Sequence, residues 1–322
     1  MGKKDPYRDP VEMPGFRSRF GGLWTDLSNA RDLVAGRLAI GEISERDALN
    51  ILAFIENGYV ILRGAVSDEL VDALNTDVAR IVANPPEEAW VNCQEDGHSV
   101  TRPLRSEDRN AHDKALKLLD LYSFLPSARE VIFAADTVTF LKLIFMRPVL
   151  VHQSLFFIKG SQQPLHKDTA FVRVSSPMEF AASWTALEDV IPGSGELIYY
   201  SGSHEDPEFL FEGKYKWCPP GSNDLGAFYA SLNDAAERRK DMRRILRVRK
   251  GDVLIWSADL AHGGGEIDDP LKTRQSIVAH YSPGNVYPMY RHYEGASEIS
   301  DYGNGQLGCF AKKVYWKSGE MS

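Results

Sequence analysis

Short runs of apolar residues, separated by Gly, Pro, Ser and Asp, dominate the chain from Val149 onward. Five of these runs are VLVHQSLFFIK, EFAASWTALEDV, ELIYYSGS, GDVLIWS and QSIVAHYS. Each contains a stretch as long as a typical β-strand, and the residues between the runs favour turns. Many short strands at this spacing are typical of an all-β sandwich or barrel.

In the first half of the chain the apolar residues recur at helical spacing instead. Residues 45–57 (ERDALNILAFIEN) predict a helix, and YVILRGA predicts a short strand directly after it. A second helix is predicted over residues 68–83, because Ser67 is a favourable N-cap with acidic residues after it. Two further helices are expected near residues 114–124 and 127–145.

The remaining segments define the expected domain organisation. Residues 1–40 show no clear periodicity and are expected to form an arm that lies over the domain. Residues 84–112 are polar and are expected to form a long loop. Residues 205–245, which include the charged stretch NDAAERRKDMRR, are expected to be an insertion between strands. No linker divides the rest, so residues 41–322 are predicted to form a single domain.

Composition excludes several classes of protein. The chain has 322 residues, of which 43% are hydrophobic and 25% charged, and its net charge is −8. This charge provides no basic field for nucleic acid, and no apolar stretch approaches the roughly 18 residues that a membrane helix requires. The three cysteines, Cys93, Cys218 and Cys309, form no CxxC pair. This usage favours a reducing compartment, so we expect a cytoplasmic protein.

The segment QQPLHKDTAF contains a candidate metal site. His166 and Asp168 are two residues apart, so on an extended strand both side chains would point to the same face. His262 follows 94 residues after Asp168, directly after the predicted strand GDVLIWS. Two histidines and one carboxylate can form the facial triad of iron(II) oxygenases, which leaves metal positions open. A lone His-x-Asp is common on protein surfaces, so this pattern is not sufficient by itself.

Arg274 makes the pattern more specific. The segment KTRQSIVAHY is predicted to be a strand, whose alternation places Arg274 and Ser276 on one face. A guanidinium is the natural bidentate partner of a carboxylate, and a serine hydroxyl adds a further hydrogen bond. A 2-oxo diacid that chelates a metal would require the metal triad and, beside it, an arginine that binds its far carboxylate.

From about Ile51 to Tyr281 the chain resembles the phytanoyl-CoA dioxygenase family. The resemblance is carried by several segments in the same order and spacing: IENGYVILRGAVSDELVDAL, LHKD, WTAL, PGSGELIYYSGSH and KGDVLIWSADLAHGGG, followed by the arginine. It implies a double-stranded β-helix (a cupin-like jelly roll) flanked by N-terminal helices. It also implies iron(II), 2-oxoglutarate and dioxygen as cofactor and co-substrates.

The resemblance also implies roles for individual residues. By motif match the iron ligands are His166, Asp168 and His262, while Arg274 holds the far carboxylate of 2-oxoglutarate. Trp184 falls where the family often has an aromatic residue beside 2-oxoglutarate. Gln153 falls where a polar residue often faces the site.

The implied reaction is hydroxylation of an unactivated C–H bond in a small organic substrate, with formation of succinate and CO2. Related halogenases replace the metal-binding carboxylate by Gly or Ala, whereas this chain keeps Asp168, so hydroxylation, or a desaturation by the same chemistry, is expected rather than halogenation. Two alternatives remain at this stage. One is a cupin-like metal enzyme that does not use 2-oxoglutarate, and the other is a silent binding domain; neither needs Arg274.

Four other residues allow two interpretations each. His204 is expected to be a structural, hydrogen-bonding histidine near the site. His280 shares the strand parity of Arg274 and could lie in the core or beside the metal ligands. Lys167 and Arg173 flank the predicted metal ligands and could bind an anionic substrate or be ordinary surface charges.

Overall fold

A large antiparallel β-sheet is the centre of the fold. The computed structural model describes residues 14–95, 98–108, 116–289 and 299–309. Within them the sheet runs in the order β1-β9-β6-β11-β5-β4-β2-β3, while β13 pairs with β12 and, in parallel, with β5. Its strands are β1 (Tyr59–Leu62), β2 (Trp90–Glu95), β3 (His98–Pro103), β4 (Lys117–Leu119), β5 (Val149–Phe157), β6 (Ala181–Ala186), β9 (Val253–Ser257), β11 (Ser276–Pro283), β12 (Ile299–Asp301) and β13 (Gln306–Cys309).

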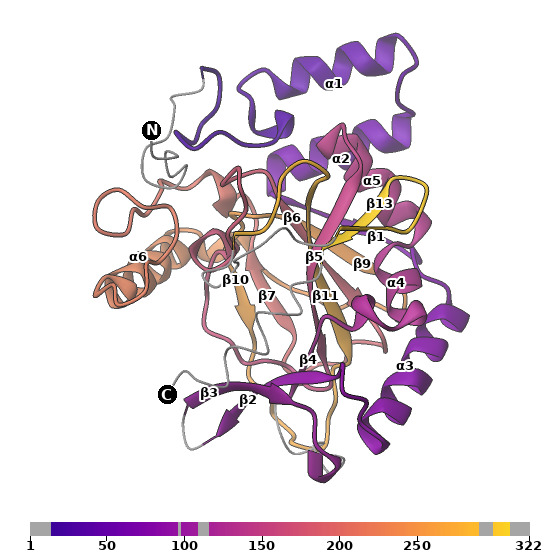
Figure 1. Ribbon diagram of the computed structural model, residues 1–322. Coiled ribbons are helices and arrows are strands. Elements are labelled where there is room, and N and C mark those ends of the chain that lie inside the picture. Colours follow the sequence, from indigo (N-terminus) through magenta and orange to yellow (C-terminus); the bar gives the residue numbers. More distant parts are fainter. Residues whose placement is uncertain (1–13, 96–97, 109–115, 290–298, 310–322) are drawn as a thin grey trace, which may run out of the picture.

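A second, smaller sheet has the order β10-β7-β8. Its strands are β7 (Leu197–Tyr200), β8 (Arg243–Ile245) and β10 (His262–Gly264). Residues of both sheets, such as Trp184 of β6 and Leu197 of β7, line one common cavity, so the sheets enclose it between them. This two-sheet arrangement (Figure 1) agrees with the predicted jelly roll. The five predicted strands after Val149 are β5, β6, β7, β9 and β11, and all five are confirmed.

Helices cover the outer face of the large sheet. The described helices are α1 (Ala30–Ala39), α2 (Glu45–Asn57), α3 (Asp68–Ala83), α4 (Pro126–Ile132), α5 (Ala135–Phe145) and α6 (Leu225–Arg238). Side chains of α2 to α5 share one hydrophobic core with outward-facing sheet residues such as Ile277 and Ala279 of β11. Val278 and His280 of the same strand face the other way and line the cavity. This alternation separates the core from the site.

The predicted boundaries of α2 and α3 are confirmed, and each helix has a cap. Ser44 accepts a hydrogen bond from the backbone of Asp47, whose side chain bonds back to Ser44. Gly58 ends α2 in the left-handed conformation, with a φ of 78°, which glycine adopts without strain. Ser67 caps α3 through the backbone N–H of Leu70.

Three expectations about the first half were wrong. Residues 84–112 are not a long loop, because they contain β2 and β3, which extend the large sheet beyond β4 to its edge and whose exposed polar residues conceal the alternation. The helix expected near 114–124 is replaced, over its described residues, by β4 and a short 3-10 helix, Leu121–Ser123. A short apolar run is compatible with either a strand or a helix, and here the segment forms a strand because it pairs with β5. The helix expected over 127–145 is two helices that meet at Phe133–Ala134.

The N-terminal segment and the insertion lie against each other. Residues 1–40 were expected to be an arm without periodicity, but their described part contains α1. Arg17 forms an ion pair of 2.8 Å with Glu205, and Ser18 Oγ donates a hydrogen bond of 2.6 Å to Glu208. The insertion 205–245 contains α6, which includes the first half of the charged stretch NDAAERRKDMRR. Among the described residues, no helix is long and apolar enough to cross a membrane.

Candidate metal centre and adjoining cavity

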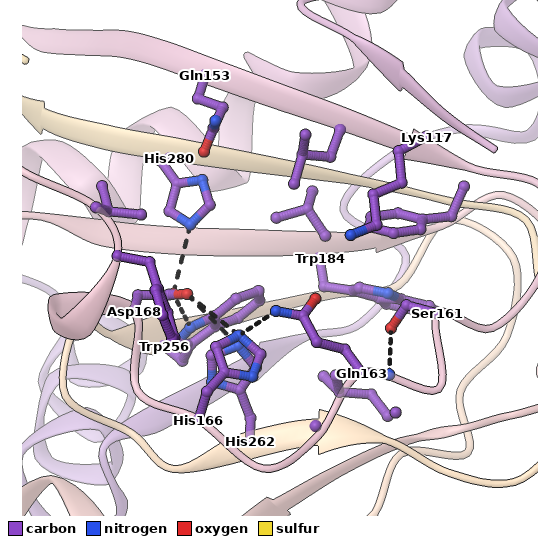
Figure 2. Close-up of a pocket in the computed structure, with 18 of the residues that line it drawn as sticks. Lys117, Gln153, Ser161, Gln163, His166, Asp168, Trp184, Trp256, His262 and His280 are labelled. Atoms are coloured by element: carbon purple, nitrogen blue, oxygen red, sulfur yellow. Dashed lines mark hydrogen bonds and ion pairs between the residues drawn. The ribbon is translucent and has the colours of Figure 1, made fainter. Parts of the chain in front are cut away.

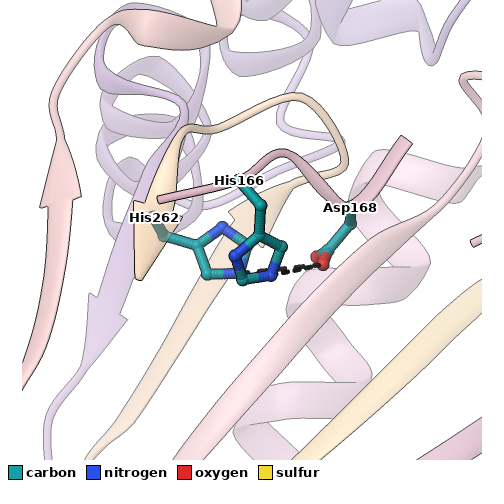
Figure 3. Close-up of side chains that lie close together, drawn as sticks. All are labelled: His166, Asp168 and His262. Atoms are coloured by element: carbon teal, nitrogen blue, oxygen red, sulfur yellow. Dashed lines mark ion pairs between the residues drawn. The ribbon is translucent and has the colours of Figure 1, made fainter. Parts of the chain in front are cut away.

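Three side chains with metal-binding atoms converge at the mouth of the cavity. His166, Asp168 and His262 each offer one such atom, and these atoms lie within 4.8 Å of one another (Figure 3). The Nε2 atoms of His166 and His262 lie 3.8 and 3.7 Å from the same oxygen, Oδ1 of Asp168. All three side chains are buried. Two imidazoles and a carboxylate in this arrangement could hold a divalent transition metal and leave coordination positions open.

Backbone pairing brings the two histidines together although they are far apart in the sequence. The N–H of His166 donates to the carbonyl of His262 at 2.8 Å, and the N–H of His262 donates back at 2.9 Å. Gly264 continues this ladder by donating to the carbonyl of Gln163. A Cβ on Gly264 would lie 2.6 Å from the backbone nitrogen of Gln162, so the close approach requires glycine here.

Hydrogen bonds fix the orientation of both imidazole rings. His166 Nδ1 lies 2.8 Å from the carbonyl oxygen of Pro164, and His262 Nδ1 lies 2.9 Å from that of Leu260. A carbonyl only accepts, so Nδ1 carries the proton and Nε2 presents its lone pair toward Asp168. Burial, assisted by the neighbouring His262, lowers the pKa of His166 to about 4. The ring is therefore neutral near pH 7, as a metal ligand must be.

The second oxygen of Asp168 is held by the large sheet. Trp256 Nε1 donates a hydrogen bond of 2.9 Å to Oδ2, and His280 Nε2 lies 3.4 Å from the same oxygen (Figure 2). Burial alone would raise the pKa of Asp168, but the neighbouring His262 and His280 outweigh it and hold this pKa well below its usual range. Oδ1 is thereby left to face the two histidines, as an anionic ligand.

The cavity beside this triad has a volume of about 170 Å³. Three of the residues assigned by family resemblance, Gln153, Trp184 and Arg274, line it together with the triad. Ser276 is not among the lining residues, although it lies on the same side of β11 as Val278. Arg274 precedes β11 rather than lying on it, so the expectation that it belongs to this strand was wrong. Its backbone N–H bonds instead to the carbonyl of Ile158.

Several buried donors near Arg274 have no partner within the described residues. They are Nε of Arg274, Oγ of Ser276 and Nε1 of Trp184. The guanidinium lies over the Trp184 ring, 5.3 Å from its centroid, and is only 2% exposed. Burial lowers the pKa of Arg274 to about 10, so the side chain remains charged near pH 7. Glu188 and Glu196 act on this charge from nearby, but within the described residues neither forms a direct ion pair with it. A buried cation without a direct partner is costly, and an anionic ligand in contact with it would reduce that cost.

The expectation that the His-x-Asp pair lies on an extended strand was also wrong. His166 forms only an isolated bridge with His262, and Asp168 begins a short 3-10 helix, Asp168–Ala170. The two side chains nevertheless converge. The ladder with His262 keeps the backbone extended at His166, and the contact with Trp256 orients Asp168.

The structure gives the surroundings of the four residues whose role the sequence left open. His280 lies beside Asp168, whereas His204 is buried and bonds through Nε2 to the carbonyl of Ile55, as a structural histidine does. Lys167 is buried and forms an ion pair with Asp259, so it is neither a surface charge nor a lining residue of the cavity. Arg173 lies over the ring of Trp217, 3.9 Å from its centroid.

Sequence reasoning missed three residues that the structure places at the site: Lys117, Gln163 and Trp256. Lys117 lies on β4, in a segment expected to be helical, so its position could not be found. Gln163 lies in an irregular segment, with its side-chain nitrogen 3.2 Å from His166 Nε2. Trp256 could have been found, because strand alternation in GDVLIWS places it with Leu254, on the face opposite Ile255.

Comparison with known proteins yields a family and a fold. The family model described as phytanoyl-CoA dioxygenase (PhyH) matches residues 54–268, about two-thirds of the chain. The chain is 23% identical over 252 residues to the peroxisomal phytanoyl-CoA dioxygenase of Bos taurus, covering 76% of this chain and 70% of that protein.

Two solved structures are similar over most of the chain. The α-ketoglutarate-dependent epimerase SnoN from nogalamycin biosynthesis has a TM-score of 0.58 at 16% identity, covering 82% of this chain and 98% of SnoN. EctD from S. alaskensis has a TM-score of 0.54 at 20% identity, covering 75% of this chain and 77% of EctD. With the two-sheet architecture described above, these likenesses show that the fold is a cupin-like jelly roll.

Proposed function

The chain belongs to the phytanoyl-CoA dioxygenase family, and we propose that it is an iron(II)- and 2-oxoglutarate-dependent dioxygenase that hydroxylates a small organic substrate. A non-haem iron, 2-oxoglutarate-dependent oxygenase is the general class to which its family and fold point. The observation that carries the proposal is the buried guanidinium of Arg274, whose Nε has no partner within the described residues, in the same cavity as the triad.

The proposed iron ligands are His166, Asp168 and His262. The donor set suits the metal, because both histidines present Nε2 and the aspartate presents one oxygen to a common point. Oδ2 of Asp168 is already engaged by Trp256. Oδ1 is therefore the oxygen that would hold a metal together with the two histidines, which would leave other coordination positions open.

The proposed anchor of 2-oxoglutarate is Arg274, with Trp184 as a further donor from the cavity lining, while the role of Ser276, which does not line the cavity, stays a prediction. Their unpaired atoms are donors, so the group that fits them is an acceptor, and the guanidinium fork matches a carboxylate. Trp184 also provides a flat apolar wall, beside which the carbon chain of 2-oxoglutarate would lie. Gln153 is a further polar residue of the cavity lining.

Iron(II) at this site would supply dioxygen activation coupled to conversion of 2-oxoglutarate into succinate and CO2. The chain's own contribution is to bind, orient and exclude water. Leu155, Phe157 and Val278 give the cavity apolar walls that keep bulk water from the reacting groups. Asp168 stays ionised beside the two histidines, where it would hold the metal, and Arg274 would hold the co-substrate in one orientation.

Hydroxylation is the outcome that Asp168 favours. A carboxylate occupies the position at which related halogenases have Gly or Ala, so halide has no ready coordination site. The relatives include an epimerase, SnoN, and EctD, which has been crystallised with 2-oxoglutarate and 5-hydroxyectoine. The substrate of this chain is proposed to be a small organic molecule, with no role for nucleic acid. A single domain over residues 41–322 and a cytoplasmic location stay predictions, and the bovine relative is named as peroxisomal.

A succinate assay tests the proposal. Purified protein with iron(II), ascorbate and 2-oxoglutarate would be screened across lipid thioesters, amino acids and secondary metabolites. The wild type should form succinate faster with one class, whereas His262→Ala should show no stimulation. Stimulation that survives in His262→Ala would contradict the proposed site. A cupin-like metal enzyme without 2-oxoglutarate would bind metal but fail to bind 2-oxoglutarate, and a silent binding domain would bind no metal.

A further inference from the structure

A buried ion-pair cluster lies directly behind the triad, outside the cavity that holds it. The carboxylate of Asp259 is 2% exposed and contacts two buried ammonium groups, Lys167 at 3.2 Å and Lys216 at 3.1 Å. Its other oxygen accepts a hydrogen bond of 2.6 Å from Thr169 Oγ1. Lys216 also contacts Glu208, so two cations are matched by two anions.

The cluster joins the two chain segments that carry the triad. Lys167 and Thr169 are the immediate neighbours of Asp168, and both bond to the carboxylate of Asp259. Asp259 lies three residues before His262, on the turn that follows β9. The carboxylate of Asp259 thus connects the residues on both sides of Asp168 to the turn that leads into His262.

Lys216 extends this connection to the insertion. It lies in the 205–245 segment, together with Glu208, to which Ser18 of the N-terminal segment also bonds. A continuous series of polar contacts therefore runs from residue 18 through the insertion to the residues flanking Asp168. These contacts are separate from the backbone ladder between His166 and His262.

We propose that Asp259 is a positioning residue for the metal site, and that Lys216 of the insertion is the charge partner that keeps it in place. The proposal rests on the function proposed above, and it assigns to the insertion a part in setting the metal geometry. Asp259 does not touch the metal. It acts through Lys167 and Thr169, by holding Asp168 at a fixed distance from His262.

Cobalt(II) is a suitable probe, since its visible absorption bands report coordination geometry and its titration gives an affinity without turnover. Asp259→Asn keeps the shape of the side chain and can still accept from Thr169, but it removes the charge. We expect this variant to bind cobalt roughly 10- to 100-fold more weakly than the wild type, with altered absorption bands. Lys216→Met should change both readouts in the same direction by a smaller factor.

Asp108→Asn is the matched control. Asp108 is also a fully buried carboxylate, paired with the Arg102 guanidinium through contacts of 2.7 and 2.9 Å, but neither residue lines the cavity. It should lower the thermal midpoint while leaving cobalt affinity and spectrum unchanged, which separates positioning from a general loss of stability.

Wild-type affinity and spectrum in folded Asp259→Asn would overturn the proposal. If Asp259→Asn does not fold, Lys216→Met decides, and unchanged cobalt binding in that variant would overturn it as well. Failure of the proposed function would look different. In that case His262→Ala would bind cobalt as tightly as the wild type, which would show that the metal does not occupy the triad.

Discussion

The indole Nε1 of Trp256 donates a hydrogen bond of 2.9 Å to Oδ2 of Asp168, so the sheet holds one carboxylate oxygen while the other faces His166 and His262. Trp256 is 2% exposed, which fixes the indole in place. The contact explains how Asp168 keeps a defined orientation although it lies outside any regular strand. It also makes the metal site sensitive to a residue that is not a ligand.

The contact can be removed with little change in packing by Trp256→Phe. We expect roughly 10- to 100-fold weaker binding of cobalt(II) or iron(II), because the carboxylate would lose its fixed orientation. Calorimetric titration of the metal would measure this. Trp24→Phe is the control, since Trp24 Nε1 donates a similar hydrogen bond, of 3.0 Å, to the carbonyl of Leu143 on α5. Equal metal affinity in the two variants would refute the role of Trp256.

The triad itself is tested by His166→Ala and His262→Ala. Each should abolish specific binding of one metal ion per chain while leaving the far-ultraviolet circular dichroism unchanged, because the jelly roll forms without either imidazole. Metal content after dialysis, measured by atomic absorption, provides the test, with exposed His98→Ala as the control. Retention of stoichiometric iron by either variant would show that the ligands lie elsewhere.

Gly264 is predicted to be needed for the close approach of the two metal-binding segments. Gly264→Ala would place a Cβ 2.6 Å from the backbone nitrogen of Gln162, so the ladder must open. We expect a loss of about 1–3 kcal/mol in the free energy of unfolding and weaker metal binding. Gly226→Ala on α6 is the control, because a Cβ there meets nothing within 4 Å and should stabilise the helix slightly. Denaturant unfolding would contradict the prediction if Gly264→Ala were as stable as the wild type.

His204 should contribute to acid sensitivity. Burial lowers its pKa to about 4, below the ordinary value of 6.5, so between these pH values the unfolded state binds a proton that the folded state does not. Its contribution to stability is therefore complete above pH 6.5 and is lost as the pH falls toward 4. Between pH 7 and 5 this group should cost about 2 kcal/mol.

Denaturant unfolding at pH 7 and pH 5, with a chelator present, would measure that cost. The loss of stability between the two pH values should be about 2 kcal/mol smaller in His204→Asn than in the wild type. The same loss in both proteins would mean that His204 is protonated in the folded state.

The sequence predicts the helices and strands best where local signals agree with the tertiary structure. The helix expected over residues 45–57 and the cap expected at Ser67 are both found in the structure, and the strand carrying Val278 and His280 alternates between core and cavity as its pattern indicates. The positions of the three triad residues follow from motif spacing. Their convergence could not be derived from periodicity, because it depends on a bridge between segments about 100 residues apart.

The parts that could not be predicted depend on pairing across the sheet. Lys117 reaches the cavity only because β4 pairs with β5, and nothing local distinguishes its segment from a helix. The burial of Asp259 and Lys216 could not be anticipated, because charged residues are usually exposed and their ion pair joins segments 43 residues apart. The pairing of Trp256 with Asp168 likewise requires the three-dimensional fold.

Arg274 distinguishes an iron- and 2-oxoglutarate-dependent oxygenase from a metal protein of another kind. The guanidinium is buried, and within the described residues no carboxylate forms an ion pair with it. If 2-oxoglutarate is its partner, removing it leaves that carboxylate desolvated and unpaired, at a cost of about 2–5 kcal/mol. Lysine should recover only part of this, since a point charge cannot reproduce the planar fork.

The most direct measurement is a titration of 2-oxoglutarate against cobalt-loaded protein without dioxygen. Arg274→Ala should bind 2-oxoglutarate roughly 30-fold to several thousand-fold more weakly than the wild type, with Arg274→Lys between them. Cobalt affinity should be the same in all three, and exposed Arg80→Ala should behave as the wild type. An unchanged dissociation constant for 2-oxoglutarate in Arg274→Ala would contradict the assignment of this cavity to 2-oxoglutarate.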